Sequence, residues 1–101
     1  MASILSTILI IDDEKNTREG LKTFLESQDY DVLTAANGDE GWSIYKQEKP
    51  DLVLTDIRMP GTDGVALLEK IKADHPSTAV ILLTAYGSVD DAVKAMKKGA
   101  Y

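Results

Sequence analysis

The sequence of 101 residues contains no cysteine, which excludes disulfides, thiolate metal sites and cysteine nucleophiles. No apolar run approaches the length of a membrane span, and residues 1–7 lack the basic and apolar regions of a signal peptide. Only 11 Lys and Arg stand against 17 Asp and Glu, so the formal net charge of −6 disfavours direct binding to nucleic acid. Glycine-rich phosphate loops are also missing, which argues against nucleotide binding. These absences predict a cytoplasmic protein without a direct membrane or nucleic-acid partner.

What the sequence does contain is a regular alternation of short apolar runs and longer amphipathic segments. The apolar runs, which we expect to be strands, are residues 7–11, 31–36, 52–55 and 79–84. The expected helices are residues 15–28, residues 39–48, a segment that follows Gly64, and residues 89–98. This alternation predicts repeated βα units, and therefore an α/β fold with a doubly wound parallel sheet. A chain of this length fits a single small domain.

Two of the apolar runs end at aspartate. Asp12 and Asp13 follow the first run, and Asp56 follows the third. Because ligands of open α/β sheets bind outside the carboxyl ends of the strands, neighbouring strands would bring the three carboxylates together. Like charges at close range recruit a cation, and hard oxygen ligands suit Mg²⁺. The fourth run ends at Thr84, whose hydroxyl can donate a hydrogen bond to a phosphoryl group held there.

A carboxylate can act as the nucleophile in phosphoryl transfer and form an aspartyl-phosphate. Asp56 is the better candidate for this role, because Asp12 and Asp13 are adjacent and one of them can face a metal. Simpler interpretations exist: an isolated Asp-Asp after a strand is usually a helix N-cap, and an isolated threonine such as Thr84 is usually a cap or turn hydroxyl. Their combination at matching strand ends favours the phosphoryl-transfer site. A lone histidine, His75, is a weak indication of catalysis.

Three segments of the sequence carry a family resemblance. They read IIDDE at residues 10–14, DLVLTDIRMPGTDG at residues 51–64 and LLTA at residues 82–85. In order and spacing they resemble the signature segments of the response-regulator receiver domains of two-component signalling. Residues 87–92 are similar, more weakly, to receivers of the nitrogen-regulatory-protein-C type. The resemblance implies one receiver domain over residues 1–101, with a flavodoxin-like fold and the sheet order 2-1-3-4-5.

The resemblance also implies a role for each matching residue. Asp56 corresponds to the phosphoacceptor, which takes a phosphoryl group from the phosphohistidine of a kinase. Asp13 and Asp56 correspond to direct carboxylate ligands of Mg²⁺, while Asp12 acts through water. The backbone carbonyl of Arg58 completes the protein ligands, and Thr84 corresponds to the switch hydroxyl. Phosphorylation is then expected to shift the segment that begins at Thr84 between two states.

The implied partner is a sensor histidine kinase, and the implied output domain, such as one that regulates transcription, is absent from these residues. On this interpretation the chain is a signalling module and not an enzyme. One alternative is a degenerate receiver that serves only as an interaction surface. Another is a Mg²⁺-dependent phosphatase with an aspartyl-phosphate intermediate. Such phosphatases place an acidic residue two positions after the nucleophile, where this sequence has Arg58 after Asp56, so the phosphatase is disfavoured.

The sequence departs from the family after the fourth strand. Receivers carry a fifth strand that ends in lysine, a switch aromatic before that lysine and a fifth helix, and these residues, which end at Tyr101, include none of them. Because the lysine neutralises phosphoryl oxygens, we expect Mg²⁺ binding with slow phosphorylation or none. We also expect strand 79–84 to be an uncovered edge and the stripe of Leu21, Phe24 and Leu25 to lose a packing partner. Both features predict self-association through the exposed edge, exchange of elements between copies, or marginal stability.

Overall fold

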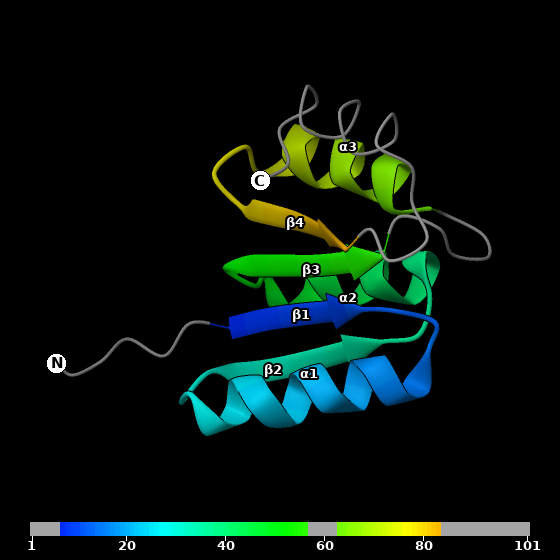
Figure 1. Cartoon of the computed structure of the whole chain (residues 1–101). Helices are drawn as coiled ribbons and strands as arrows, with labels where there is room; N and C mark the ends of the chain where they lie inside the picture. The colour runs from blue at the N-terminus through cyan, green and yellow to red at the C-terminus, as the bar shows by residue number, and fades with distance from the viewer. Residues whose placement is uncertain (1–6, 57–62, 84–101) are drawn as a thin grey trace, which may run out of the picture.

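A parallel sheet with helices on both faces forms the body of the protein (Figure 1). The structure, a computed structural model, describes residues 7–56 and 63–83. The strands are β1 (Thr7–Ile11), β2 (Asp31–Ala35), β3 (Leu52–Asp56) and β4 (Ala79–Leu83), and the helices are α1 (Lys15–Ser27), α2 (Gly38–Glu48) and α3 (Gly64–Asp74). Strands and helices alternate along the chain, so the predicted α/β fold with a doubly wound sheet is confirmed.

The strands of the described residues lie in the order β2-β1-β3-β4, and every neighbouring pair is parallel. This order agrees with the one that the family resemblance implies for the first four strands. Asp56 is the last residue of β3 itself, one residue beyond the predicted strand end. The expected strand end at Thr84 and the expected helix over residues 89–98 lie outside the described residues. No helix within the described ranges is long and apolar enough to cross a membrane.

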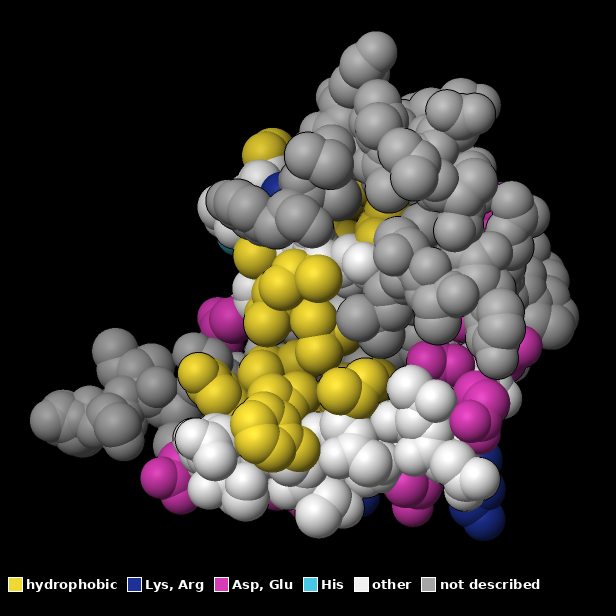
Figure 2. All heavy atoms as spheres, in the orientation of Figure 1, with side chains coloured by type: hydrophobic (Ala, Val, Ile, Leu, Met, Phe, Trp, Pro, Cys, Tyr) yellow, Lys and Arg dark blue, Asp and Glu magenta, His cyan; other side chains and the backbone are white. Residues whose placement is uncertain are grey.

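The two faces of the sheet are packed to different degrees. One core cluster joins α2 and α3 to the sheet and includes Leu9, Val53 and Leu67, each 0% exposed. The opposite face carries α1, which has no buried residue and whose Phe24 is 61% exposed. Figure 2 shows hydrophobic side chains gathered over the sheet on this side. Phe24 is thus largely exposed, whereas Leu21 and Leu25 are half-buried, and the loss of a packing partner for this stripe stays a prediction.

Helix α2 lies unusually close to β1 because residue 41 has no side chain. A Cβ atom placed at Gly41 would meet the side chain of Ile11, with Cγ1 at 2.9 Å and Cδ1 closer still. Ile11 is the last residue of β1 and is fully buried. The glycine thus allows α2 to press on the strand directly before Asp12 and Asp13.

A second tie joins the C-terminal ends of α2 and α3. The hydroxyl of the buried Tyr45 donates a hydrogen bond to Asp74 Oδ2 over 3.0 Å, and Lys49 Nζ lies 2.7 Å from the same oxygen. The Tyr45 ring also stacks on Trp42 with 5.5 Å between ring centroids. Burial, together with the hydrogen bond to Asp74, raises the pKa of Tyr45 above its ordinary value. The tie therefore holds best while the phenol is protonated.

We expect Gly41→Ala to lower the free energy of unfolding by about 1–3 kcal/mol, because the added methyl group overpacks the contact with Ile11. Chemical denaturation measures the change. Gly20→Ala in α1 is the matched control: apart from its chain neighbours and the backbone of its own helix, no atom lies within 4 Å of the added Cβ, so this variant should be stabilised by about 0.5–1 kcal/mol through helix propensity. Equal effects of the two substitutions would contradict the packing argument.

Stability should also fall as the solution becomes alkaline. A tyrosine whose folded pKa is raised stabilises the fold fully below its unfolded pKa of about 10, and this contribution is lost as the pH rises through the folded value. We expect Tyr45→Phe to cost about 1 kcal/mol at neutral pH, through the lost hydrogen bond, and to make the alkaline decline shallower. Denaturation between pH 8 and pH 12 tests this; Tyr30→Phe, at an exposed tyrosine, should leave the decline unchanged.

Candidate functional site

Three carboxylates meet at the carboxyl edge of the sheet. Asp12 and Asp13 directly follow β1, and Asp56 ends the neighbouring β3. The two strands pair in parallel with Ile11 opposite Thr55, so their ends lie side by side. One carboxylate oxygen from each aspartate lies within 4.8 Å of the other two. The structure thus brings together the three aspartates that the sequence placed in one site.

Backbone contacts hold Asp12 in place. Its side chain is buried, with 4% of the residue exposed, and Oδ1 accepts a hydrogen bond of 2.8 Å from the Glu14 amide. Its own amide donates to the Ala35 carbonyl at 3.1 Å, which extends the pairing of β1 with β2. Its carbonyl accepts a hydrogen bond of 2.8 Å from Arg18 Nη1. Asp13 is exposed beside it, so the site combines one fixed carboxylate with one that faces solvent.

The N-cap of α1 is Glu14 and not the Asp-Asp pair. Glu14 Oε1 accepts a hydrogen bond of 2.7 Å from the Asn16 amide, and Oε2 accepts one of 3.2 Å from the Thr17 hydroxyl. The simpler interpretation of Asp12 and Asp13 as a helix cap is therefore wrong for the first turn of this helix. Because another residue caps the helix, the capping role does not occupy the exposed carboxylate of Asp13.

The donor atoms of the cluster are all oxygen. Such a set suits a hard divalent cation such as Mg²⁺, which prefers carboxylate ligands and keeps several waters. In the absence of a cation the three charges repel one another, by about 1 kcal/mol for each pair even in a water-like surrounding. The cluster can therefore bind a cation that neutralises this charge, and a carboxylate within it can act as a nucleophile.

Two predicted site residues, Arg58 and Thr84, lie outside the described residues. Thr84 follows Leu83 in the sequence, and Leu83 pairs with Asp56 in the register of β3 and β4. Arg58 stands two positions after Asp56. Their roles as switch hydroxyl and carbonyl ligand stay predictions.

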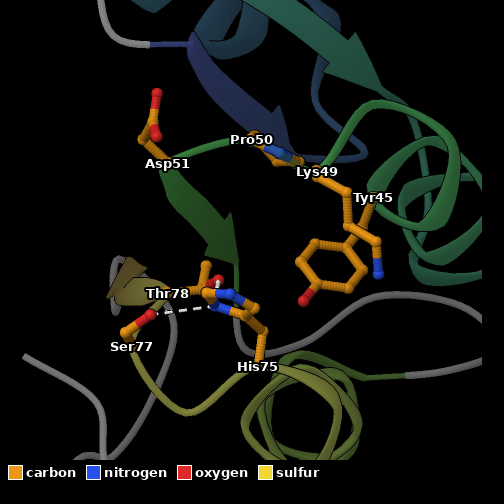
Figure 3. A pocket seen from close by; sticks show the side chains of 7 residues that line it. All are labelled: Tyr45, Lys49, Pro50, Asp51, His75, Ser77 and Thr78. Atoms are coloured by element: carbon orange, nitrogen blue, oxygen red, sulfur yellow. Dashed lines mark hydrogen bonds between the residues drawn. The ribbon is translucent and has the colours of Figure 1, made fainter.

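A cavity of about 250 Å³ lies at the opposite edge of the sheet, where β3 and β4 begin (Figure 3). It is lined by Tyr45, Lys49, Pro50, Asp51, His75, Ser77 and Thr78. His75 Nδ1 lies 3.0 Å from the Ser77 hydroxyl and 3.2 Å from the Thr78 hydroxyl, so the ring belongs to the turn after α3. The ammonium group of Lys49 is paired with Asp74. The Lys49–Asp74 pair therefore serves the packing of two helix ends, and the Asp51 carboxylate accepts a hydrogen bond of 2.9 Å from the Thr7 amide. The acidic cluster is the better functional candidate.

Sequence reasoning missed Glu14 and Arg18 as parts of the acidic site. Both are polar residues at the start of α1, and their contacts reach back to Asp12. The available signal was their position within five residues after the Asp-Asp pair. A charged residue in the first turn of a helix is common, however, and spacing alone does not say that its side chain returns to a strand end.

Comparison with known proteins identifies the family. The family described as "Response regulator receiver domain" matches residues 8–101. The chain is 40% identical over 97 residues to the regulatory protein AtoC of Escherichia coli strain K12, covering 96% of this chain and 21% of AtoC. It is 39% identical over 94 residues to the transcriptional regulator NtrC of Salmonella typhimurium, covering 93% of this chain and 20% of NtrC. The chain thus spans about a fifth of the length of these relatives.

Comparison with solved structures leads to the same family. A response regulator receiver domain protein from Clostridium thermocellum superposes with a TM-score of 0.91 at 41% identity, covering 96% of this chain and 79% of that one. NtrX from Brucella abortus, solved with ADP, gives a TM-score of 0.90 at 33% identity, and the match covers 97% of this chain and 23% of NtrX. Together with the converging aspartates and the sheet order, these similarities establish that the chain belongs to the response-regulator receiver domains of two-component signalling, with NtrC-like and AtoC-like relatives.

Proposed function

We propose that residues 1–101 form a phosphoacceptor receiver domain, in which Asp56 takes a phosphoryl group from a partner histidine kinase in a Mg²⁺-dependent reaction. The convergence of Asp12, Asp13 and Asp56 within 4.8 Å is the observation that carries this proposal. Asp56 suits the nucleophile because its backbone is held in β3, between β1 and β4. A fixed backbone limits the motion of the attacking carboxylate, and positioning is the main task of a protein in phosphoryl transfer.

The aspartates would share the binding of the cation in this proposal. Asp13 and Asp56 would hold it directly, Asp12 would hold it through water, and the carbonyl of Arg58 would complete the set. Bound Mg²⁺ would neutralise negative charge on the phosphoryl oxygens. The buried Asp12 contributes a fixed negative charge, because hydrogen bonds on its amide, carbonyl and Oδ1 restrain it.

The transfer forms one bond and breaks another. A carboxylate oxygen of Asp56 attacks phosphorus, and the bond between phosphorus and the donor imidazole nitrogen breaks. The imidazole nitrogen keeps the electron pair and takes a proton from solvent, while Asp56 becomes an aspartyl-phosphate. The hydroxyl of Thr84 then donates a hydrogen bond to the phosphoryl group. Movement of Thr84 toward that group shifts the segment that follows it between two states.

The domain acts as a module in signal transduction, with its output in another part of a longer protein. The matched relatives include proteins named as transcriptional regulators, and this chain corresponds to about a fifth of their length. We therefore propose regulation of transcription as the output and the cytoplasm as the location. A histidine kinase supplies the phosphoryl group, and the domain is not itself an enzyme.

We expect Asp56 to be modified slowly, and at this one site, when the chain is incubated with Mg²⁺ and a small phosphodonor. Intact-mass measurement should show one added phosphoryl group in the wild type and none in Asp56→Asn, because the amide is not a nucleophile of this kind. The reaction is followed over a long incubation, so that slow modification is also detected.

Omission of Mg²⁺ and the Asp51→Asn variant are the controls for this experiment. Asp51 lies at the opposite end of β3, so its variant should be modified like the wild type. Modification that persists in Asp56→Asn would contradict the assignment of the acceptor. Repeated turnover of a generic phosphate ester would instead favour the phosphatase alternative.

Neutralising Asp13 should separate charge repulsion from metal binding. In EDTA we expect Asp13→Asn to raise the free energy of unfolding by about 1–2 kcal/mol, because two of the three repulsive carboxylate pairs are removed. Excess Mg²⁺ should raise the melting temperature of the wild type, since a ligand that binds only the folded state stabilises it, and should raise that of Asp13→Asn much less.

Asp31→Asn is the matched control for Asp13→Asn. Asp31 is exposed and begins β2, at the edge of the sheet opposite the acidic cluster. This variant should keep the full response to Mg²⁺. Equal stabilisation of the wild type and Asp13→Asn by Mg²⁺ would exclude a metal at the acidic cluster.

A further inference from the structure

Arg18 connects α1 to the end of β1 next to the acidic cluster. Its Nη1 atom donates a hydrogen bond of 2.8 Å to the carbonyl of Asp12, and the side chain is half-buried. Its backbone amide donates a hydrogen bond of 3.0 Å to the Glu14 carbonyl, and this bond closes the first turn of the helix. The side chain therefore reaches back over a full helical turn to a strand end.

Three hydrogen bonds close the loop between β1 and α1. The Glu14 amide binds Asp12 Oδ1 at 2.8 Å, the Arg18 amide binds the Glu14 carbonyl, and the Arg18 guanidinium binds the Asp12 carbonyl. Asp13 lies inside this loop and makes up the exposed part of the acidic cluster. Each of the three bonds restricts the backbone on one side of Asp13. The bond from Arg18 fixes the peptide group that joins Asp12 to Asp13.

We propose that Arg18 is the positioning residue of the acidic site, which holds the Asp12–Asp13 peptide in the geometry that binds the cation. This inference rests on the proposed Mg²⁺ site. A guanidinium group suits the task because it is planar, always charged and presents several donors in a fixed arrangement. A hydrogen bond from a charged donor is stronger than one between neutral groups, and partial burial protects it from solvent.

The charge of Arg18 and its positioning role have opposite effects on Mg²⁺ affinity. A guanidinium group near the cluster repels a divalent cation, so its removal would raise the affinity if charge alone mattered. Loss of the hydrogen bond releases the Asp12–Asp13 peptide, so the affinity falls if positioning matters more. The direction of the change therefore distinguishes the two roles, which a measurement of stability would not do.

The test is calorimetric titration of Mg²⁺ into the wild type, Arg18→Met, Arg18→Lys and Lys22→Met. We expect Arg18→Met to bind roughly tenfold more weakly, as is usual when an outer-sphere partner of a ligand is removed. Arg18→Lys retains the charge and one donor, so its affinity should fall between those of the wild type and Arg18→Met. Lys22→Met removes a positive charge from the same helix one turn further on, and its affinity should stay within about twofold of the wild type.

A second measurement needs no metal. Amide hydrogen exchange is measured by NMR in the presence of EDTA. The exchange rate of the Glu14 amide, which donates a hydrogen bond to Asp12 Oδ1, reports how well ordered the loop is. We expect this amide to exchange about tenfold faster in Arg18→Met than in the wild type, which corresponds to a loss of about 1.4 kcal/mol of local order. The Leu67 amide, which donates to the Asp63 carbonyl in α3, should exchange at an unchanged rate in both proteins.

The two measurements separate failure of this inference from failure of the proposed function. Mg²⁺ binding in Arg18→Met that equals or exceeds that of the wild type overturns the positioning role, as does unchanged exchange of the Glu14 amide. If the wild type binds no Mg²⁺, the proposed site fails, and the exchange of the Glu14 amide still decides the role of Arg18. If Arg18→Met does not fold, Arg18→Lys takes its place, with weaker binding and faster exchange expected and wild-type values overturning the proposal.

Discussion

The parallel pairing of β1 with β3 is the constraint on which the site depends. It sets Ile11 opposite Thr55, and this register makes the two strands end together at the carboxyl edge of the sheet. The resulting repulsion costs about 1 kcal/mol for each carboxylate pair. Ile8, Leu9, Ile10 and Ile11 are at most 2% exposed, and burial of each contributes about 1.5–3 kcal/mol. Burial of β1 is therefore the larger of these two contributions, and it favours the strand register that brings the aspartates together.

The sequence predicted the features that follow from strand pairing and periodicity. Apolar runs mark the strands, and a parallel sheet places the residues after them at one edge, so Asp12, Asp13 and Asp56 could be assigned to one site. Contacts between side chains and distant backbone groups could not be predicted in this way. The bond from Arg18 to the Asp12 carbonyl depends on the side-chain conformation of one residue, and no repeating pattern encodes it.

The contacts between helices show the same difference between periodic patterns, which can be predicted, and contacts between distant residues, which cannot. Trp42 and Tyr45 lie three residues apart, which is helical spacing, but the partner of the Tyr45 hydroxyl, Asp74, is 29 residues away. Only the approach of α2 to α3 brings the two together. Capping was also ambiguous, because Asp12, Asp13 and Glu14 can all accept hydrogen bonds from a first-turn amide. The geometry of the turn selects Glu14, which the residue types alone do not.

The packing of α1 determines what controls the site. Helices α2 and α3 are fixed by a shared apolar core and by the Tyr45–Asp74 tie, whereas α1 has no buried residue. Its position relative to the sheet thus depends more on polar contacts at its N-terminus, and these contacts end on the acidic cluster through Glu14 and Arg18. The N-terminal end of α1 is therefore joined to the acidic site by hydrogen bonds, whereas its apolar residues Leu21 and Leu25 are only half-buried.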